Sequence, residues 1–133
     1  MHHTNKLKLF YALTATSIVV SGIIAPSLSS AQTLQINNVR LIHQLYNENE
    51  LAAMRKYHGK YAIVSGRVDR VDGSDLVIEG DGEFGRLFCK FSNTDMDKVI
   101  ALREDDRVTV RGTLDLSSGF FGLDLKMHDC RIN

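Results

Sequence analysis

The chain has 133 residues, with 16 basic and 16 acidic side chains and two cysteines. This length corresponds to one domain. The lack of a basic excess argues against a protein that holds nucleic acid through charge alone. Cys89 and Cys130 are too far apart in sequence, and lack the partners, to form a redox pair or a zinc site.

The first thirty or so residues have the pattern of a secretory signal peptide. Lys6 and Lys8 give a positive start, and an apolar run over 9–24 follows. Pro26, a serine-rich stretch and small residues at 29–31 then form a cleavage site. We expect cleavage near Ala31, which leaves a chain that begins at Gln32.

An uncut membrane anchor is the alternative interpretation of this segment. About 20 apolar residues are needed to cross the hydrocarbon core of a bilayer, and the run over 9–24 is shorter and interrupted by hydroxyl groups. We therefore expect a periplasmic or secreted protein without a stable membrane anchor. The signal segment holds two of the basic residues and no acidic ones, so the mature chain has 14 basic against 16 acidic residues, a formal charge of −2.

The segment 39–57 is predicted to be helical, because apolar residues recur at helical spacing from Val39 to Tyr46 and again at 52–54. The polar stretch 47–49 leaves open whether this is one helix or two short ones. Gly59 ends the helix by supplying a left-handed residue. The residues before it, 32–38, are polar and are expected to form a frayed lead-in.

After Gly59 the apolar residues alternate, which is the pattern of strands. Strands are predicted over 60–71, 76–79 and 86–91, with a hairpin turn at 72–75. Asn93 to Asp95 are predicted to cap a short helix over 96–102. Two further strands follow, separated by a turn at Ser117–Gly119. They cover 107–114 and 121–132, and a bulge near His128 is expected in the last one.

This order, with three strands, a short helix and two more strands, is that of an OB-fold barrel. The fold class is therefore mainly β: a five-stranded OB-fold barrel over 59–133, preceded by a lead-in and helix over 32–58. Closure of such a barrel brings the third and fifth strands together. A disulfide between Cys89 and Cys130 is then expected, in preference to two buried thiols.

The stretch from Asn49 to Ile132 resembles the tRNA-anticodon-like OB-fold family of exported or lipid-anchored bacterial proteins. The resemblance implies the barrel fold and brings no catalytic residues with it. Many members have a lipidation cysteine after the signal, which this chain lacks. The resemblance rests on Asn49, Ala53, and the stretches 56–60, 64–68, 87–91, 106–112 and 130–132.

The outward face of the third strand is the first candidate site, because OB folds bind ligands on their second and third strands. Arg86, Phe88 and Lys90 share that face, so an aromatic ring lies between two cations as in a stacking platform. Packing of Phe88 beneath the N-terminal helix is the competing and favoured interpretation. Arg67, on the outward face of the first strand, is a further candidate.

Phe120 and Phe121 lie in the connection between the last two strands. One ring is expected to plug the barrel end, and the other is a candidate contact at its mouth. His43, His58 and His128 have no ligands at metal-binding spacing, so no metal and no cofactor is predicted. The sequence contains no nucleophile elbow, phosphate loop or dinucleotide motif, and no enzyme is predicted.

These features favour a non-catalytic binding module of the cell envelope that engages a protein, a peptide or a glycan. The alternative is a protein that binds single-stranded nucleic acid or oligonucleotides, as the fold and the Arg86–Phe88–Lys90 strip would allow. The slightly acidic mature chain argues against that alternative.

Overall fold

A computed structural model of the chain describes residues 32–80 and 85–133. The predicted signal peptide lies outside these residues. Within the described parts, no helix is both long enough and apolar enough to span a membrane. The buried apolar cluster runs from Ile36 to Ile132 inside one compact unit, Thr33–Asn133, so residues 32–133 contain a complete core of their own.

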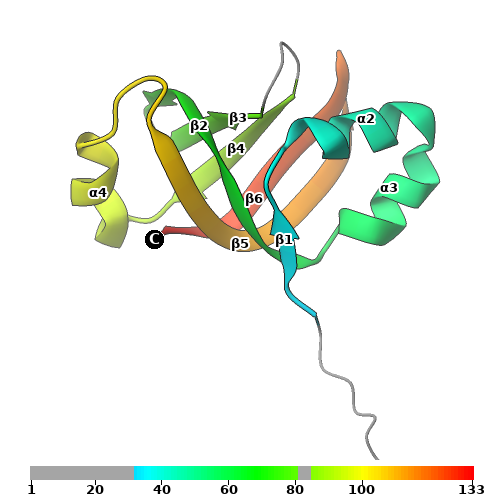
Figure 1. The fold of residues 1–133 in the computed structure, drawn as a ribbon, viewed down its shortest axis with the longest axis horizontal. Helices are drawn as coiled ribbons and strands as arrows, with labels where there is room; N and C mark the ends of the chain where they lie inside the picture. Colours follow the sequence, from blue (N-terminus) through cyan, green and yellow to red (C-terminus); the bar gives the residue numbers. More distant parts are fainter. Residues whose placement is uncertain (1–31, 81–84) are drawn as a thin grey trace, which may run out of the picture. The chain divides into compact units, whose positions relative to one another are not determined.

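Five strands close into the predicted barrel (Figure 1). Neighbours in the sheet follow the order β2-β3-β4-β6-β5, and β5 pairs back onto β2. All of these pairs are antiparallel except β4 with β6, which run parallel. This is the OB-fold arrangement. The strands are β2 (Tyr61–Asp72), β3 (Asp75–Glu79), β4 (Arg86–Phe91), β5 (Arg107–Gly119) and β6 (Gly122–Ile132).

The polar lead-in contains a strand that the sequence analysis missed. Within it, β1 (Leu34–Ile36) pairs in parallel with β2, with Leu34 opposite Ala62 and Ile36 opposite Val64. The expectation of a frayed lead-in was therefore wrong here. Ile36 is buried and Leu34 packs against the core, so two apolar side chains hold this short strand in place.

The N-terminal helical segment consists of two helices, α2 (Arg40–Glu48) and α3 (Glu50–Tyr57). Asn49 separates them with an extended backbone, and its side chain accepts a hydrogen bond from the backbone N–H of Ala52 at 3.0 Å. This cap starts a new helix where the polar stretch interrupts the pattern. Gly59 follows with φ +75°, as predicted. Helix α2 contacts β6, and helix α3 contacts β5.

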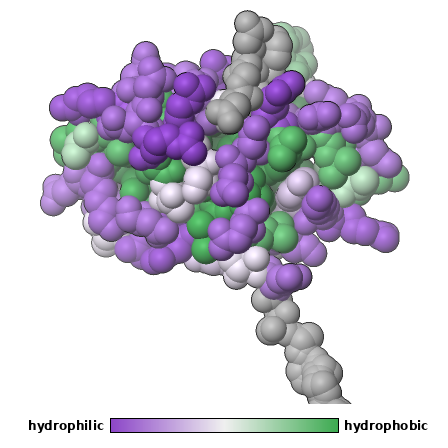
Figure 2. Space-filling model, in the orientation of Figure 1, coloured by the Kyte–Doolittle hydropathy of each residue, from purple (hydrophilic) through white to green (hydrophobic). Residues whose placement is uncertain are grey.

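The core results from the alternation of side chains along the strands. In β2 every second residue from Ala62 to Val68 is buried, whereas residues 63, 65 and 67 are partly exposed. Ile42, Tyr46, Ala53 and Tyr57 add the apolar sides of the two helices to the same cluster. Figure 2 shows mostly hydrophilic residues on the face in view, with hydrophobic residues in smaller patches between them.

Two mid-strand glycines allow strands to approach closely. A Cβ atom on Gly66 would lie 2.6 Å from Ile78 Cγ2, and one on Gly112 would lie 2.6 Å from the carbonyl oxygen of His128. Gly112 faces the predicted bulge of β6, where the register shifts and Asp129 has φ +53°. Both glycines are therefore required by the backbone geometry of the barrel.

The parallel contact between β4 and β6, here called the seam, is closed by a disulfide. Cys89 and Cys130 are bonded, with their Cα atoms 5.5 Å apart, which confirms the predicted pairing. Parallel pairs are slightly weaker per residue than antiparallel ones, and this pair also shifts register between Cys89 and Phe91. The covalent bond therefore secures an irregular contact between strands.

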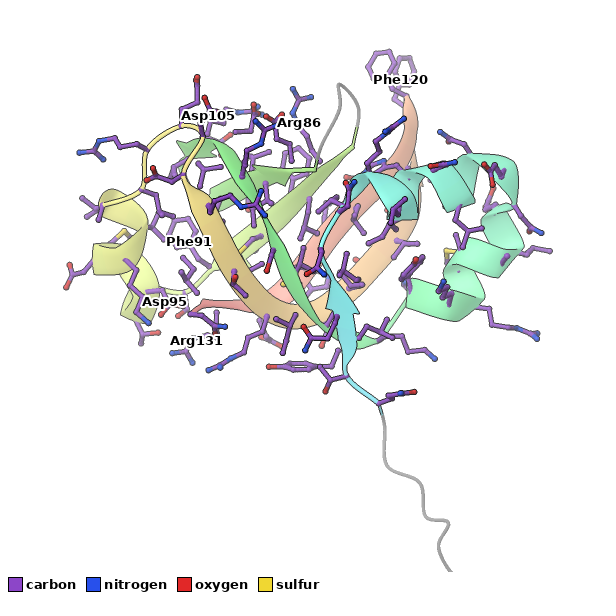
Figure 3. All side chains as sticks on the ribbon, viewed as in Figure 1. Arg86, Phe91, Asp95, Asp105, Phe120 and Arg131 are labelled. Carbon is purple, nitrogen blue, oxygen red and sulfur yellow. A yellow bond between two sulfur atoms is a disulfide. The ribbon has the colours of Figure 1, made fainter. Side chains whose placement is uncertain are left out.

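A buried carboxylate fastens the end of β6 beside the seam. Asp95, 2% exposed, ends a 3-10 turn, η2 (Asn93–Asp95), before α4 (Met96–Ile100). Its Oδ2 accepts hydrogen bonds from the backbone N–H of Ile132 at 3.0 Å and from Arg131 Nε at 3.1 Å. Figure 3 shows Asp95 and Arg131 on adjacent elements. Asp95 stands at the N-cap position of α4, within the predicted 93–95, but its side chain makes no capping hydrogen bond there. Ser92 caps the preceding turn η2 by accepting a hydrogen bond from the backbone N–H of Thr94.

Opposing effects act on the pKa of Asp95. Burial alone would raise it, but the hydrogen bonds from Ile132 and Arg131, with the charges of Arg131 and Lys98, outweigh burial and hold it below its usual range. Asp95 is therefore a stabilising anion in the folded protein.

The hairpin between β5 and β6 is longer than predicted. The expected turn at Ser117–Gly119 is wrong, because these residues continue β5 and pair with Leu123, Asp124 and Gly122 of β6. The chain turns instead at Phe120 and Phe121. Serine and glycine are typical of turns, but here cross-strand pairing extends the strand through them.

Removing both cysteines is expected to weaken the barrel strongly. The disulfide closes a sequence separation of 41 residues, which in the chain-entropy model stabilises the fold by roughly 4 kcal/mol. Urea unfolding of Cys89→Ala/Cys130→Ala should show a loss of that order. Dithiothreitol should lower the stability of the wild type but leave the double variant unchanged. A loss below about 1 kcal/mol would mean that packing alone closes the seam.

Asp95→Asn is expected to destabilise the protein by about 1–2 kcal/mol at neutral pH, through weakened charge-assisted hydrogen bonds. A carboxylate with a lowered folded-state pKa adds stability above its unfolded value, about 3.9, and loses it as the pH falls through the folded value. The gap between wild type and variant should therefore narrow as the pH falls below about 4. Asp97→Asn, at an exposed position of α4, is the control. A gap independent of pH would contradict this role of the charge.

Candidate functional site

The candidate strip on β4 lies at the centre of an outward-facing surface shared by three strands. Phe88 is directly opposite Val77 of β3 and Lys126 of β6. Val77 alternates in phase with Asp75 and Glu79, so it lies on the outer face of β3, yet it is fully buried. Its neighbour Phe88 is half-buried. Part of the outer face of the sheet is therefore apolar and covered.

Phe88 lies in a hollow of about 270 Å³, here called the Phe88 hollow. Its walls come from both sides of the seam. Charged side chains of both signs surround the ring, so the hollow offers one aromatic surface within a mixed electrostatic environment. The lining residues are Asp75, Phe88, Lys90, Asp124, Lys126, Met127 and His128.

Most charges of the Phe88 hollow are already balanced within the chain. Lys126 Nζ lies 3.4 Å from Asp124 Oδ2, and His128 Nε2 lies 2.8 Å from Asp115 Oδ2. Lys90 is opposite Asp75 in the β3–β4 pairing, but no ion pair joins them among the described contacts. This leaves one cation and one anion beside the ring with capacity for a ligand.

Arg86 belongs to a different environment from Lys90. Its Nε donates to Asp69 Oδ2 at 3.1 Å, and the same oxygen accepts a bond from Arg70 at 2.8 Å. Its guanidinium is therefore paired within the chain. The basic strip predicted around Phe88 is reduced by this ion pair, and the surface is not a cationic platform.

Phe88 also borders a second hollow of about 410 Å³, here called the helix-side hollow. His43 of α2 lies in its wall, with its Nε2 at 2.9 Å from the carbonyl oxygen of Arg86. Burial lowers the pKa of His43, and the bond to the Arg86 carbonyl opposes that shift. A neutral His43 is therefore the donor. Phe88 and α2 both line this hollow, so a space lies between them where the sequence analysis expected Phe88 to pack beneath the helix. The lining residues are His43, Asn47, Gly85, Arg86, Phe88, Phe121 and Leu123.

Arg67 does not join either hollow. It lies on β2, opposite Glu79 of β3 and Arg107 of β5. Its side chain is partly buried, and its Nε is buried without a hydrogen-bond partner. The structure therefore separates Arg67 from the other candidate residues.

Phe120 and Phe121 form the exposed tip of the β5–β6 hairpin, where Figure 3 labels Phe120. They are 93% and 96% exposed and stack edge to face with their centroids 4.8 Å apart. The expectation that one ring plugs the barrel was wrong. Leu116 and Leu125, opposite each other further down the hairpin, are buried there instead.

Sequence reasoning missed a histidine–aspartate–histidine group beside the Phe88 hollow. Asp115 bonds His128 with one oxygen, and its other oxygen lies 3.7 Å from His58 Nδ1. That nitrogen accepts a hydrogen bond from the backbone N–H of Leu116 at 3.0 Å. Thr113 and Asp115 lie two residues apart on β5, so alternation places both on the outer face, and this was the signal that the sequence offered. The contact between Asp115 and His128 could not be predicted, because it depends on the bulge in β6. Among the described residues, no group of three potential ligands could hold a metal.

The chain is similar to several solved structures at low sequence identity. A lipoprotein from Klebsiella pneumoniae, provisionally named as nucleic acid-binding, gives a TM-score of 0.52 at 20% identity and covers 82% of this chain and 99% of that chain. The hypothetical protein ygiW from E. coli gives 0.43 at 13% identity, covering 83% and 97%. An OBody bound to hen egg-white lysozyme gives 0.40 at 15% identity, covering 58% and 79%.

No protein-family model and no curated protein matches the chain. At 20% identity, the similarity to the Klebsiella lipoprotein supports the fold alone.

Replacing both tip phenylalanines is expected to leave stability almost unchanged. Phe120→Ser/Phe121→Ser alters only exposed rings, so the free energy of unfolding should change by about 0.5 kcal/mol or less. Leu125→Ser is the matched control, because Leu125 is buried on the same hairpin and its loss should cost about 3 kcal/mol. Chemical denaturation measures both. Equal losses in the two variants would place the phenylalanines in the core.

Proposed function

We propose that this chain is a non-catalytic binding module that takes a short peptide segment of a partner protein in the Phe88 hollow. The observation that carries the proposal is the half-buried Phe88 beside Lys90 and Asp75, which lie opposite each other on β4 and β3 without forming an ion pair. An apolar side chain would stack on the ring, while neighbouring charges of both signs would meet Lys90 and Asp75.

Several features support export of the protein. The first 31 residues have the pattern of a signal peptide, and a disulfide persists in oxidising compartments. The periplasm or the outside of the cell is therefore the proposed location, after cleavage near Ala31. Membership of the tRNA-anticodon-like OB-fold family belongs to the same proposal and is supported by the quoted motifs and the fold.

Binding without catalysis agrees with the way the titratable groups are used. His43 and Asp95, whose pKa values are lowered, both bond to backbone groups. In the Phe88 hollow, His128 and Lys126 have aspartate partners. These contacts hold side chains in place and leave the ring as the main contact surface.

Single-stranded nucleic acid is the second candidate ligand class, because Arg86, Phe88 and Lys90 alternate on the outer face. The pairing of Arg86 with Asp69 and the two aspartates in the hollow disfavour a polyanion there. We therefore rank the peptide first.

A displayed library of random peptides, selected on residues 32–133, tests the proposal. We expect enrichment of sequences in which an apolar residue has charged residues of both signs near it. Phe88→Ser should weaken their binding at least tenfold, since stacked aromatic anchors dominate such contacts. Phe120→Ser is the matched control, because this exposed phenylalanine lies outside the hollow.

The same protein should give no gel shift with single-stranded DNA or RNA at low salt. A tight, salt-sensitive shift that Phe88→Ser removes would replace the peptide with nucleic acid. Enrichment of peptides that bind Phe88→Ser as well as wild type would exclude the Phe88 hollow as the site.

A further inference from the structure

Two arginines face each other on a part of the barrel surface that neither hollow uses. Arg67 of β2 is directly opposite Arg107 of β5. Both have outward parity, because Gly66 and Val68 on one strand and Val108 on the other are buried. Like charges directly opposite each other on neighbouring strands destabilise a sheet. This pair therefore needs an explanation.

The guanidinium of Arg67 lacks a partner within the described residues. Its Nε is buried, with no hydrogen bond to any group. Glu79 is opposite Arg67 on the other side, yet no ion pair within 4.0 Å joins them. Buried polar groups are nearly always satisfied, so the exception at Arg67 needs an explanation, and a bound water or ion is one that would satisfy this nitrogen. Water would satisfy Nε, but it would leave Arg67 and Arg107 without an ion-pair partner among the described residues.

A groove of about 580 Å³ begins at Arg107, and no acidic side chain lines it. Ser65 and Thr109 lie in its floor with their hydroxyl oxygens 3.0 Å apart. Lys98 borders it and donates one hydrogen bond to the carbonyl oxygen of Ile132, which leaves two of its three N–H groups free for another acceptor. The groove thus offers a set of donors and positive charge.

We propose that the Arg67–Arg107 pair and this groove bind a phosphate group. Two guanidinium forks present planar sets of donors that match phosphate oxygens. A phosphate group carries up to two charges and at least two free oxygens, so it can bridge both arginines and still accept from Lys98 or a hydroxyl. A carboxylate has one charge and would leave part of this set unused. The inference is independent of peptide binding in the Phe88 hollow.

The groups at this site come from elements that the barrel holds rigidly. Ser65 and Arg67 lie on β2, and Thr109 and Arg107 lie on β5, in one continuous antiparallel ladder. Lys98 lies on α4, and its ammonium group donates a hydrogen bond to the carbonyl oxygen of Ile132. The backbone N–H of Ile132 donates to Asp95. The backbone positions of these residues are therefore fixed before any ligand arrives, which lowers part of the entropic cost of binding.

Calorimetric titration of residues 32–133 with inorganic phosphate, at constant ionic strength in chloride, tests the proposal. We expect saturable binding and a phosphate-dependent rise in melting temperature. Arg107→Gln removes one exposed guanidinium and should weaken binding at least tenfold. Arg55→Gln, an equal loss of charge at an exposed position of α3, should titrate like wild type.

Arg67→Lys keeps the charge but loses the planar fork, so it should bind phosphate less tightly than wild type while remaining folded. Vesicles containing phosphatidylglycerol form a second arm of the experiment. Arg107-dependent binding to vesicles alone would support a lipid headgroup as the source of the phosphate, and binding to inorganic phosphate alone would support a soluble one.

Two outcomes would overturn the proposal. The first is a titration in which Arg107→Gln responds to phosphate and to vesicles as wild type does. The second is Arg107-dependent binding of a thymidine oligonucleotide with no response to either phosphate source, which would assign the groove to nucleic acid.

Discussion

Closure of the barrel along the seam between β4 and β6 is the constraint on which the rest of the structure depends. The two strands run parallel and shift register, so backbone pairing alone holds them weakly. The Cys89–Cys130 bond fixes them covalently. The Phe88 hollow crosses this seam, with Phe88 and Lys90 on one strand and Lys126 and His128 on the other. A barrel that opened here would lose its candidate site along with its closure.

The seam is fastened twice, by chemically different means. The disulfide holds Cys130, and the buried Asp95 holds the next two residues, Arg131 and Ile132. Reduction removes the first contact and acid weakens the second, because protonation of Asp95 loses the charge that its partners favour. The disulfide and the Asp95 hydrogen bonds therefore hold three consecutive residues of β6. The stability of the last strand is therefore sensitive to the redox state and to the acidity of its surroundings.

Patterns local in sequence predicted most of the fold, and contacts between distant segments account for what they missed. Alternation predicted β2, β4 and β6, and the change of parity before Cys130 predicted the bulge. Strand β1 has only three residues, and it exists because Leu34 and Ile36 reach a core built by later strands. The candidate site shows the same division. Arg86, Phe88 and Lys90 could be found on one strand, whereas Asp124 and Lys126 join Phe88 only through the parallel pairing, which no spacing reveals.

The net charge of residues 32–133 sums surfaces that differ in their local charge, and this limits what the net charge can predict about ligands. Around Phe88 the cations have acidic neighbours, so the net charge of that face is close to zero, as it is for the chain. On the ladder of β2 and β5, Arg67 and Arg107 face each other, and no acidic side chain lines the adjoining groove. Electrostatic attraction acts over about 8 to 10 Å in physiological salt. A ligand at either place therefore responds to its local charges, and a formal charge of −2 is compatible with a local site for a small anion.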